Sequence, residues 1–298
     1  MKQVHYSPPA VHPLDAMSSE IKQKGMLVID DVKGLPSYNE PYISPHLVIA
    51  VSHEGISHGE YDMRPVVFQP HDFSVIYPNH IISAHDISSD YRATLLIISS
   101  ELYYQIHSRL AYANSQLFNS QPKFHLTDEQ YRCFCDVIRV MKTVSEMNLA
   151  RSHDIVASFL DVLSLMADEF RTKSFYMARP AMDRPTPSRT YFGAFYNLIV
   201  KHYSESREVN FYASMLCLSP KYFGNIIKQE TGINAGEWIG RYVAIRAKLL
   251  LHHRMDLTIQ QIALQLGFVD ASSFARYFKA HTGTTAKAYR NQWLGNGG

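Results

Sequence analysis

Cysteine and long apolar runs are scarce in this sequence of 298 residues, and each scarcity excludes a class of protein. The chain has three cysteines, Cys133, Cys135 and Cys217, which are too few for a disulfide framework and fit a reducing cytoplasm. No run approaches the roughly 18 consecutive apolar residues of a membrane-spanning helix. Residues 1–15 also lack the apolar core of a secretory signal. We therefore expect a cytoplasmic protein with no membrane partner.

A strong net charge is also missing, because the whole chain carries a formal charge of only +2. This value hides a division along the sequence. Residues 1–170 contain 12 basic and 20 acidic side chains, a net charge of −8, whereas residues 186–298 contain 13 basic and 6 acidic side chains, a net charge of +7. The segment 171–185 adds +3. Only the C-terminal part therefore has the charge expected of a domain that binds phosphates, and the acidic first part should avoid nucleic acid.

A pattern that occurs twice organises the basic part of the chain. Ala213 matches Ala263 at an offset of 50 residues, and Phe223 matches Phe274 at an offset of 51. One inserted residue between the two helices of the second copy explains the change in offset. Each copy has the pattern of a helix, a tight turn and a second helix.

Local sequence patterns predict where these helices begin and end. Thr258 and Gln261 form a capping box at the start of the second copy, and Gly267 can supply the left-handed residue that ends its first helix. Ser219, with a proline after it, is an N-cap for the second helix of the first copy, and Asp270 takes this role in the second copy. The sequence therefore predicts two helix-turn-helix units.

Apolar residues spaced three and four apart give each second helix one buried face and leave a polar face exposed. A supported helix with an exposed polar face is the element that helix-turn-helix proteins place in the DNA major groove. Asn225 and Arg276 have forked side chains that match base edges, so we expect them to read bases. Lys228 and Lys279 are expected to hold phosphates. The candidate DNA contacts are Ser219, Lys221, Tyr222, Gly224, Asn225 and Lys228 in the first copy and Ala271, Ser272, Ser273, Arg276 and Lys279 in the second.

Both copies and the segment between them carry more specific motifs, which are residues 218–223, 228–232, 247–250, 259–268, 274–279 and 282–283. Through these motifs the last third of the chain resembles the AraC/XylS family of bacterial transcription regulators. Two positions depart from the family pattern, since Gly224 replaces a larger, often polar residue and Val243 stands where Arg is frequent. The resemblance implies an all-α double helix-turn-helix domain that recognises promoters. It also implies recruitment of RNA polymerase and activation, as in most members.

Residues 26–99 alternate short β-rich runs with turns, a rhythm typical of a sandwich or barrel. Placed ahead of an AraC-like half, this rhythm resembles the cupin-like barrel that many such regulators carry. Residues 1–25 are polar and weakly patterned, and we expect a flexible arm there. The expected strands are residues 26–30, 46–52, 56–61, 65–69, 73–77 and 92–99.

The expected barrel is rich in histidine but lacks the metal-binding spacing of enzymatic cupins. No His-x-His pair occurs in it, and His58-Gly59-Glu60 is only a fragment of the pattern. We therefore expect no metal, no cofactor and no catalytic residue, with a small organic effector as the ligand of the barrel. A cupin-type metalloenzyme fused to a DNA-binding tail is the alternative. The residues expected to line the effector site are His46, Tyr61, His80 and Tyr91.

Two amphipathic helices are expected at residues 127–145 and 151–171, the first of them opened by a capping box of Thr127 and Gln130. Their apolar stripes fit packing against the core and fit equally a seam between two chains of a homodimer. The sequence leaves both interpretations open. Prolines then make residues 173–189 a linker.

Taken together, these patterns predict an α+β chain in three parts. A cupin-like domain for sensing or dimerisation occupies residues 1–172, and a DNA-binding domain occupies residues 190–294 after the linker. The predicted function is that of a sequence-specific transcription regulator, not an enzyme, with double-stranded DNA and RNA polymerase as partners. A non-specific architectural DNA-binding protein is a further alternative, although such a protein should be basic throughout.

The segment between the two units predicts how they bind DNA. It forms a helix from about residue 235 to 252, which spans roughly 27 Å at 1.5 Å per residue. Two non-identical units held apart by such a helix should read an asymmetric site in two consecutive major grooves. Gly240 lies inside this helix, where it either weakens the helix or permits close packing with a neighbouring unit.

Overall fold

The computed structural model of the protein describes residues 17–30, 41–103, 122–147, 149–177 and 187–294. These residues fall into two compact units, one within His12–Thr186 and the other within Pro187–Gly298. In this described part of the chain, no helix is long and apolar enough to cross a membrane.

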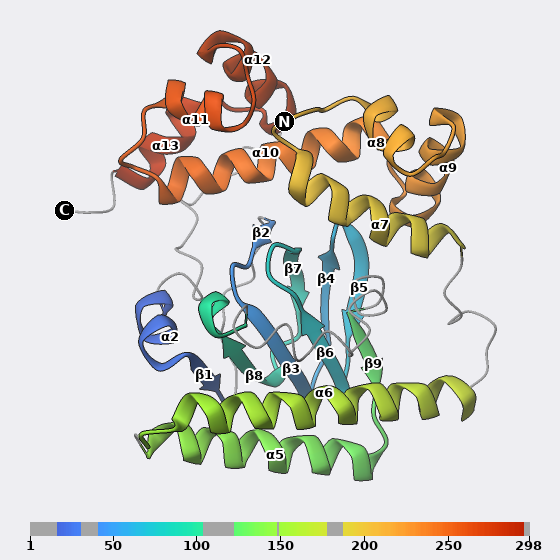
Figure 1. Ribbon diagram of the computed structural model, residues 1–298, viewed down its shortest axis with the longest axis vertical. Coiled ribbons are helices and arrows are strands. Elements are labelled where there is room, and N and C mark those ends of the chain that lie inside the picture. Colours follow the sequence, from blue (N-terminus) through green and yellow to red (C-terminus); the bar gives the residue numbers. More distant parts are fainter. Residues whose placement is uncertain (1–16, 31–40, 104–121, 148, 178–186, 295–298) are drawn as a thin grey trace. The chain divides into compact units, whose positions relative to one another are not determined.

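The N-terminal unit is built on two antiparallel sheets (Figure 1). The larger sheet has the strand order β1-β8-β3-β6-β9, and the smaller has the order β2-β7-β4-β5. The expected α+β class is confirmed, and among the described residues no strand belongs to both sheets, so the expected cupin-like barrel is not closed. The strands are β1 Met26–Ile29, β2 Tyr42–Ile43, β3 Leu47–Glu54, β4 Ser57–Tyr61, β5 Arg64–Phe68, β6 Asp72–Ile76, β7 Ile81–Ile87, β8 Arg92–Ile98 and β9 Lys123–His125.

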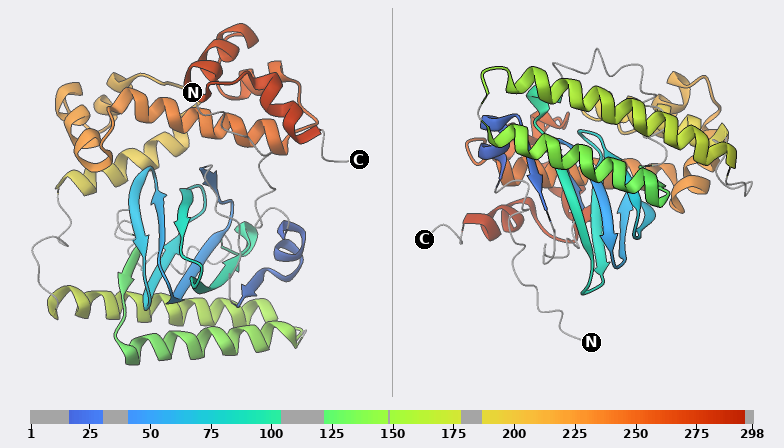
Figure 2. Two further views of the ribbon diagram at one scale, coloured as in Figure 1. Left: turned by 180° about the vertical axis from the view of Figure 1, so that it is seen from behind. Right: turned by 90° about the horizontal axis from the view of Figure 1, so that it is seen from below.

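Two long helices cover one face of the larger sheet. These are α5 (Asp128–Glu146) and α6 (Ser152–Met177), which lie side by side across the strands (Figure 2). Every second residue of a strand points to the same face, so Leu47, Ile49 and Val51 of β3 enter a common core with side chains of both helices. The capping box at the start of α5 is present as predicted, and the core-packing interpretation of the two apolar stripes is confirmed.

Each of the six runs expected to form strands contains one, with ends shifted by at most two residues. The sequence did not reveal β7, because Ser83 and the pair His85-Asp86 interrupt its apolar alternation. It also missed the short strands β2 and β9. The helix α2 (Ser18–Lys24) occupies part of the expected flexible arm, while residues 1–16 lie outside the described residues.

The C-terminal unit is all helical in its described residues. Its first helix begins at Pro187, where a proline fits the first turn, and α6 of the other unit continues to Met177. Helices therefore occupy both ends of the segment that we expected to be a linker, and residues 178–186 lie outside the described residues. The helices are α7 Pro187–His202, α8 Val209–Met215, α9 Pro220–Thr231, α10 Ala235–His253, α11 Ile259–Gln265, α12 Ala271–Thr282 and α13 Ala286–Leu294.

The long helix α10 runs through two cores and holds them together. Near its start the fully buried Trp238 packs edge-on against Phe192 and Phe195 of α7, at ring-centroid distances of 5.7 and 5.0 Å. Towards its end Ala247 and Leu251 belong to a second core with residues of α11, α12 and α13. Full burial of such side chains stabilises by roughly 1.5–3 kcal/mol each.

Gly240 of α10 permits the close packing that we considered for it. The imidazole of His281 in α12 lies against this glycine, and a Cβ atom added to Gly240 would be 2.2 Å from His281 Nε2. A larger residue at position 240 would have to displace the imidazole of His281, so glycine keeps this contact at some cost in helix propensity.

Candidate nucleic-acid interface

The first helix and turn of each unit have the same backbone frame. In the first unit the N–H of Leu218 donates to the carbonyl of Ala213 at 2.9 Å, and in the second Phe268 donates to Ala263 at the same distance. The turn residue is left-handed in both, as predicted for Gly267, which has φ 76°. The first unit has Cys217 at this position with φ 56°, a feature that the sequence did not reveal because cysteine rarely adopts it.

The second helices, α9 and α12, begin with the predicted caps. The hydroxyl of Ser219 accepts a hydrogen bond from the N–H of Tyr222 at 3.3 Å, and the carboxylate of Asp270 accepts one from the N–H of Ser273 at 2.7 Å. The backbone N–H of Ser273, together with its hydroxyl and the charge of Arg276, holds the pKa of the Asp270 carboxyl below its usual 3.8. Both helices end at a left-handed glycine.

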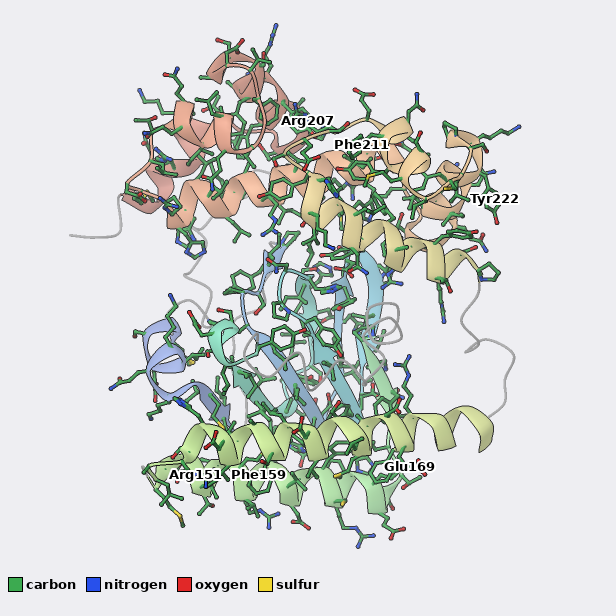
Figure 3. All side chains as sticks on the ribbon, in the orientation of Figure 1. Arg151, Phe159, Glu169, Arg207, Phe211 and Tyr222 are labelled. Carbon is green, nitrogen blue, oxygen red and sulfur yellow. The ribbon has the colours of Figure 1, made fainter. Side chains whose placement is uncertain are left out.

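The exposed face of α9 carries most of the residues predicted for it. Lys221, Asn225 and Lys228 are exposed, whereas Phe223 beside them is fully buried. Tyr222 is 48% exposed and its ring also contacts Tyr191 of α7 edge-on, so part of this side chain supports the helix (Figure 3). Gly224 lies on the same face, and a Cβ added to it would meet nothing within 4 Å.

The exposed face of α12 repeats this arrangement at an offset of 51 residues. Arg276 takes the place of Asn225, and Lys279 takes the place of Lys228. Ser272 is exposed, whereas Ala271 and Ser273 are only partly exposed at the first turn. We did not predict Ala275, which is exposed at the position equivalent to Gly224; the repeat offset would have identified it.

The cations on these two faces are available to an external anion. Within the described part of the chain, no ion pair joins Lys221, Lys228, Arg276 or Lys279 to another side chain. Figure 1 shows α9 and α12 near different stretches of α10, whose 19 residues span about 28 Å. Two cationic helix faces at this separation can reach two grooves of one DNA duplex.

The residues expected to line an effector site are all at least partly buried, but they are not all neighbours. Tyr61 and His80 form a stacked pair with ring centroids 5.0 Å apart, and His80 Nδ1 lies 2.8 Å from the buried carboxylate of Asp62. Tyr91 lies elsewhere, with its hydroxyl 3.2 Å from Ser52 Oγ. Among the described residues, no side-chain hydrogen bond or ring contact joins His46 to the other three.

Two of these four side chains, His46 and Tyr61, have buried polar atoms without a hydrogen-bond partner among the described residues. His46 is 1% exposed, and this holds for both of its ring nitrogens. Burial lowers the pKa of this imidazole below 6.5. In the part of the chain that the structure describes, no group of three or more His, Cys, Asp or Glu side chains is arranged to hold a metal ion.

Comparison with known proteins supports the helix-turn-helix assignment. Residues 212–292 match a family of helix-turn-helix domains. The regulatory protein PocR of Salmonella typhimurium is 28% identical over 176 residues, which cover 55% of this chain and 56% of PocR. The transcriptional activator RhaR of Cronobacter sakazakii is 32% identical over 68 residues, which cover 23% of this chain and 24% of RhaR. The chain thus spans about half or less of the length of the curated relatives it matches.

Solved structures also align with the chain. ToxT of Vibrio cholerae aligns over 90% of this chain and 99% of its own, at 10% identity and a TM-score of 0.41. The C-terminal domain of the response regulator AraT of Geobacillus stearothermophilus aligns over 36% of this chain and 87% of its own, at 29% identity and a TM-score of 0.32.

Proposed function

We propose, from the premise that residues 212–292 form an AraC-type helix-turn-helix domain, that the protein is a sequence-specific DNA-binding transcription regulator. One observation carries the proposal. The two units of a basic helical domain each expose a cationic helix face, and α10 holds these faces apart. A net charge of +7 in residues 186–298 suits the phosphate backbone of DNA.

In both α9 and α12, one position reads bases and a second position binds phosphates. Asn225 and Arg276 occupy equivalent positions and have the forked geometry that matches adenine and guanine edges, so they read bases. Lys228 and Lys279 are also equivalent, one helical turn further on, and bind phosphates. Because the two faces otherwise differ in sequence, the site is asymmetric and lies in two consecutive major grooves.

Genomic footprinting followed by hydroxyl-radical footprinting of the full-length chain tests this function. The expected result is an asymmetric site with protection in two grooves about 10 base pairs apart. Equal binding to unrelated competitor DNA would contradict sequence specificity and favour an architectural protein. Protection of a single groove would reject the rigid two-groove geometry.

We further propose that the bound protein activates transcription by recruiting RNA polymerase. The support is similarity, since RhaR is a transcriptional activator and 32% identical over the matched 68 residues. A promoter–reporter fusion carrying the footprinted site distinguishes the outcomes. Reporter output that rises when the protein is expressed supports activation, and output that falls identifies a repressor.

We propose a small organic effector for the N-terminal unit on a separate observation. His46 is a buried imidazole without a hydrogen-bond partner among the described residues, and its lowered pKa favours the neutral form, which can offer one donor and one acceptor to a polar group of a ligand. A ligand that binds only the folded state raises the melting temperature. In a thermal-shift screen of the full-length chain, His46→Leu should lose the shift, whereas the exposed control His58→Ala should retain it.

We propose that the exposed apolar side of α6 pairs two chains in a homodimer. Val162 and Leu165 lie three residues apart on one side of α6 and are 44% and 69% exposed, whereas Leu160 and Leu163 on another side are buried in the core. Such residues bury area when a second copy covers them. Sedimentation of the full-length chain should show a dimer that Leu165→Glu dissociates, while the matched control Val269→Glu, at a 90% exposed apolar residue of the C-terminal unit, leaves it intact.

A further inference from the structure

Arg207 connects the two helix-turn-helix units at a point outside α10 (Figure 3). It lies between α7 and α8, immediately before the first unit. Its Nη1 donates to the carbonyl of Leu266 and its Nη2 to the carbonyl of Gly267, each at 3.1 Å. These carbonyls belong to the turn of the second unit. The guanidinium also lies over the ring of Phe268, 4.1 Å from its centroid.

The chemistry of this contact favours arginine over any other cation. The carbonyls at the end of α11 have no partner within the helix and carry the negative end of its dipole. The two donors of a planar guanidinium reach two neighbouring carbonyls at once, while its flat face stacks on an aromatic ring. A lysine ammonium can keep the charge but cannot make the stacked, two-pronged contact.

The backbone beside Arg207 is equally close to the second unit. A Cβ atom added to Gly267 would lie 1.7 Å from the carbonyl oxygen of Ser204, so only glycine allows this segment to lie against the turn. The equivalent turn residue of the first unit is Cys217, which carries a full side chain. The two turns therefore differ: the segment that precedes the first unit packs against the turn of the second unit, where the turn residue is glycine.

A row of rings extends the contact to the recognition helix itself. Phe268 packs against Tyr277 of α12 at 5.1 Å, and Tyr277 stacks on His281 at 4.1 Å. His281 in turn rests on Gly240 of α10. The helix α12 is thus held between Arg207 on one side and α10 on the other.

We infer that Arg207 is a positioning residue that fixes the orientation of α12 relative to α9, and so sets which spacing between the two DNA half-sites the protein accepts. The inference rests on the proposed DNA-binding function. Arg207 itself need not touch DNA. Its removal leaves each recognition helix with its own base contacts but lets the second unit turn about its remaining contacts with α10.

The test uses full-length Arg207→Ala and Arg207→Lys with three DNA duplexes built on the footprinted site: the intact site, the site with the α12 half scrambled, and the site with its spacer lengthened by one base pair. For Arg207→Ala, affinity for the intact site should fall roughly tenfold, and affinity for the scrambled site should not change. The preference for the natural spacer over the longer one should also shrink. Arg207→Lys should lie between this variant and the unsubstituted protein.

Arg241→Ala is the matched control. Arg241 belongs to the same domain and has the same charge, but among the described residues its ion pair is with Glu237, one turn away on α10. The Arg241→Ala substitution should lower the affinity for all three duplexes by the same factor. Both tryptophans of the chain lie in this domain, at positions 238 and 293, so their fluorescence shows whether each variant is folded.

Two results distinguish a failure of the proposed DNA-binding function from a failure of the positioning role of Arg207. If the unsubstituted protein does not distinguish the intact from the scrambled site, the proposed function fails. If it does distinguish them, but folded Arg207→Ala and Arg207→Lys keep the natural spacer preference or weaken all three duplexes equally, the positioning role is overturned.

Discussion

The two helix-turn-helix units share a backbone frame but differ in what surrounds it. Both turns place one residue in the left-handed region, at φ 56° in Cys217 and φ 76° in Gly267. The turn of the first unit tolerates a side chain at this position. The turn of the second lies under the carbonyl of Ser204 and is held by Arg207. The backbone conformation of the turn therefore does not by itself require glycine. Glycine is required where another segment of the chain, here at Ser204, packs against the turn.

The largest difference between the units is expected at this turn residue. Gly267→Ala forces a Cβ to within 1.7 Å of Ser204 O at a left-handed φ, so it should destabilise the domain by about 3 kcal/mol or more. Cys217→Gly should change stability by less than about 1 kcal/mol, because relief of strain offsets the added freedom of the unfolded chain. Urea unfolding followed by tryptophan fluorescence measures both. Similar losses in the two variants would show that the turns are constrained alike.

The next largest difference concerns the DNA half-site that each helix reads. Arg276→Ala should cost roughly 1–3 kcal/mol of binding and relax base preference in the α12 half only, and Asn225→Ala should relax preference in the α9 half only. Binding of a randomised-site library to each variant, followed by sequencing, shows which half loses its preference.

Lys228→Ala and Lys279→Ala are the matched controls for base reading. Each should weaken all sequences about equally and reduce the salt dependence of binding by roughly one phosphate contact. If Arg276→Ala also weakens all sequences equally, the distinction between base-reading and phosphate-binding positions is wrong.

A smaller difference is expected between the N-caps of α9 and α12, in how the stability that each cap contributes depends on pH. Ser219→Ala should cost about 1 kcal/mol at any pH, because the hydroxyl does not titrate. The Asp270 carboxyl has a folded-state pKa below its usual 3.8, so its stabilisation is present above that value and lost as the pH falls through the lower folded-state pKa. Asp270→Ala should therefore lower the melting temperature at pH 6 and have a shrinking effect below pH 3.8.

Asp270→Asn tests the same cap without a titrating group. An amide oxygen caps nearly as well, so this variant should stay close to the unsubstituted protein at pH 6. A loss in Asp270→Ala that remains constant down to the lowest pH would mean that the carboxylate charge contributes nothing to the cap.

The sequence predicts well the features that depend on residues close together in the chain, and predicts poorly those that depend on residues far apart in it. Caps such as Thr258 with Gln261, and the glycine turn, depend on residues within a few positions of each other, and these predictions were confirmed. The pairing of the strands depends on contacts between residues far apart in the chain, so the sequence did not reveal that the two sheets of the expected cupin-like barrel are not closed. Arg207 belongs to this second kind, because its partners Leu266 and Gly267 lie about 60 residues further along the chain.

The smallest expected effect is a change in stability at one position on each of the two helix faces that we expect to contact DNA. Gly224 and Ala275 occupy equivalent positions in the interiors of α9 and α12. Since a Cβ at Gly224 would meet nothing, Gly224→Ala should stabilise the domain by up to about 1 kcal/mol, and Ala275→Gly should destabilise it by a similar amount. Urea unfolding should thus give shifts of opposite sign for the two substitutions, as expected if helix propensity alone acts at both sites.

DNA binding by the same pair decides what the glycine is for. If the missing side chain lets α9 approach the DNA more closely than α12, Gly224→Ala should weaken binding to the intact site although it stabilises the protein, and Ala275→Gly should leave binding almost unchanged. If affinity instead remains unchanged in both variants, the two helices lie at similar depths in their grooves. The departure at Gly224 would then weaken α9 without any benefit for recognition.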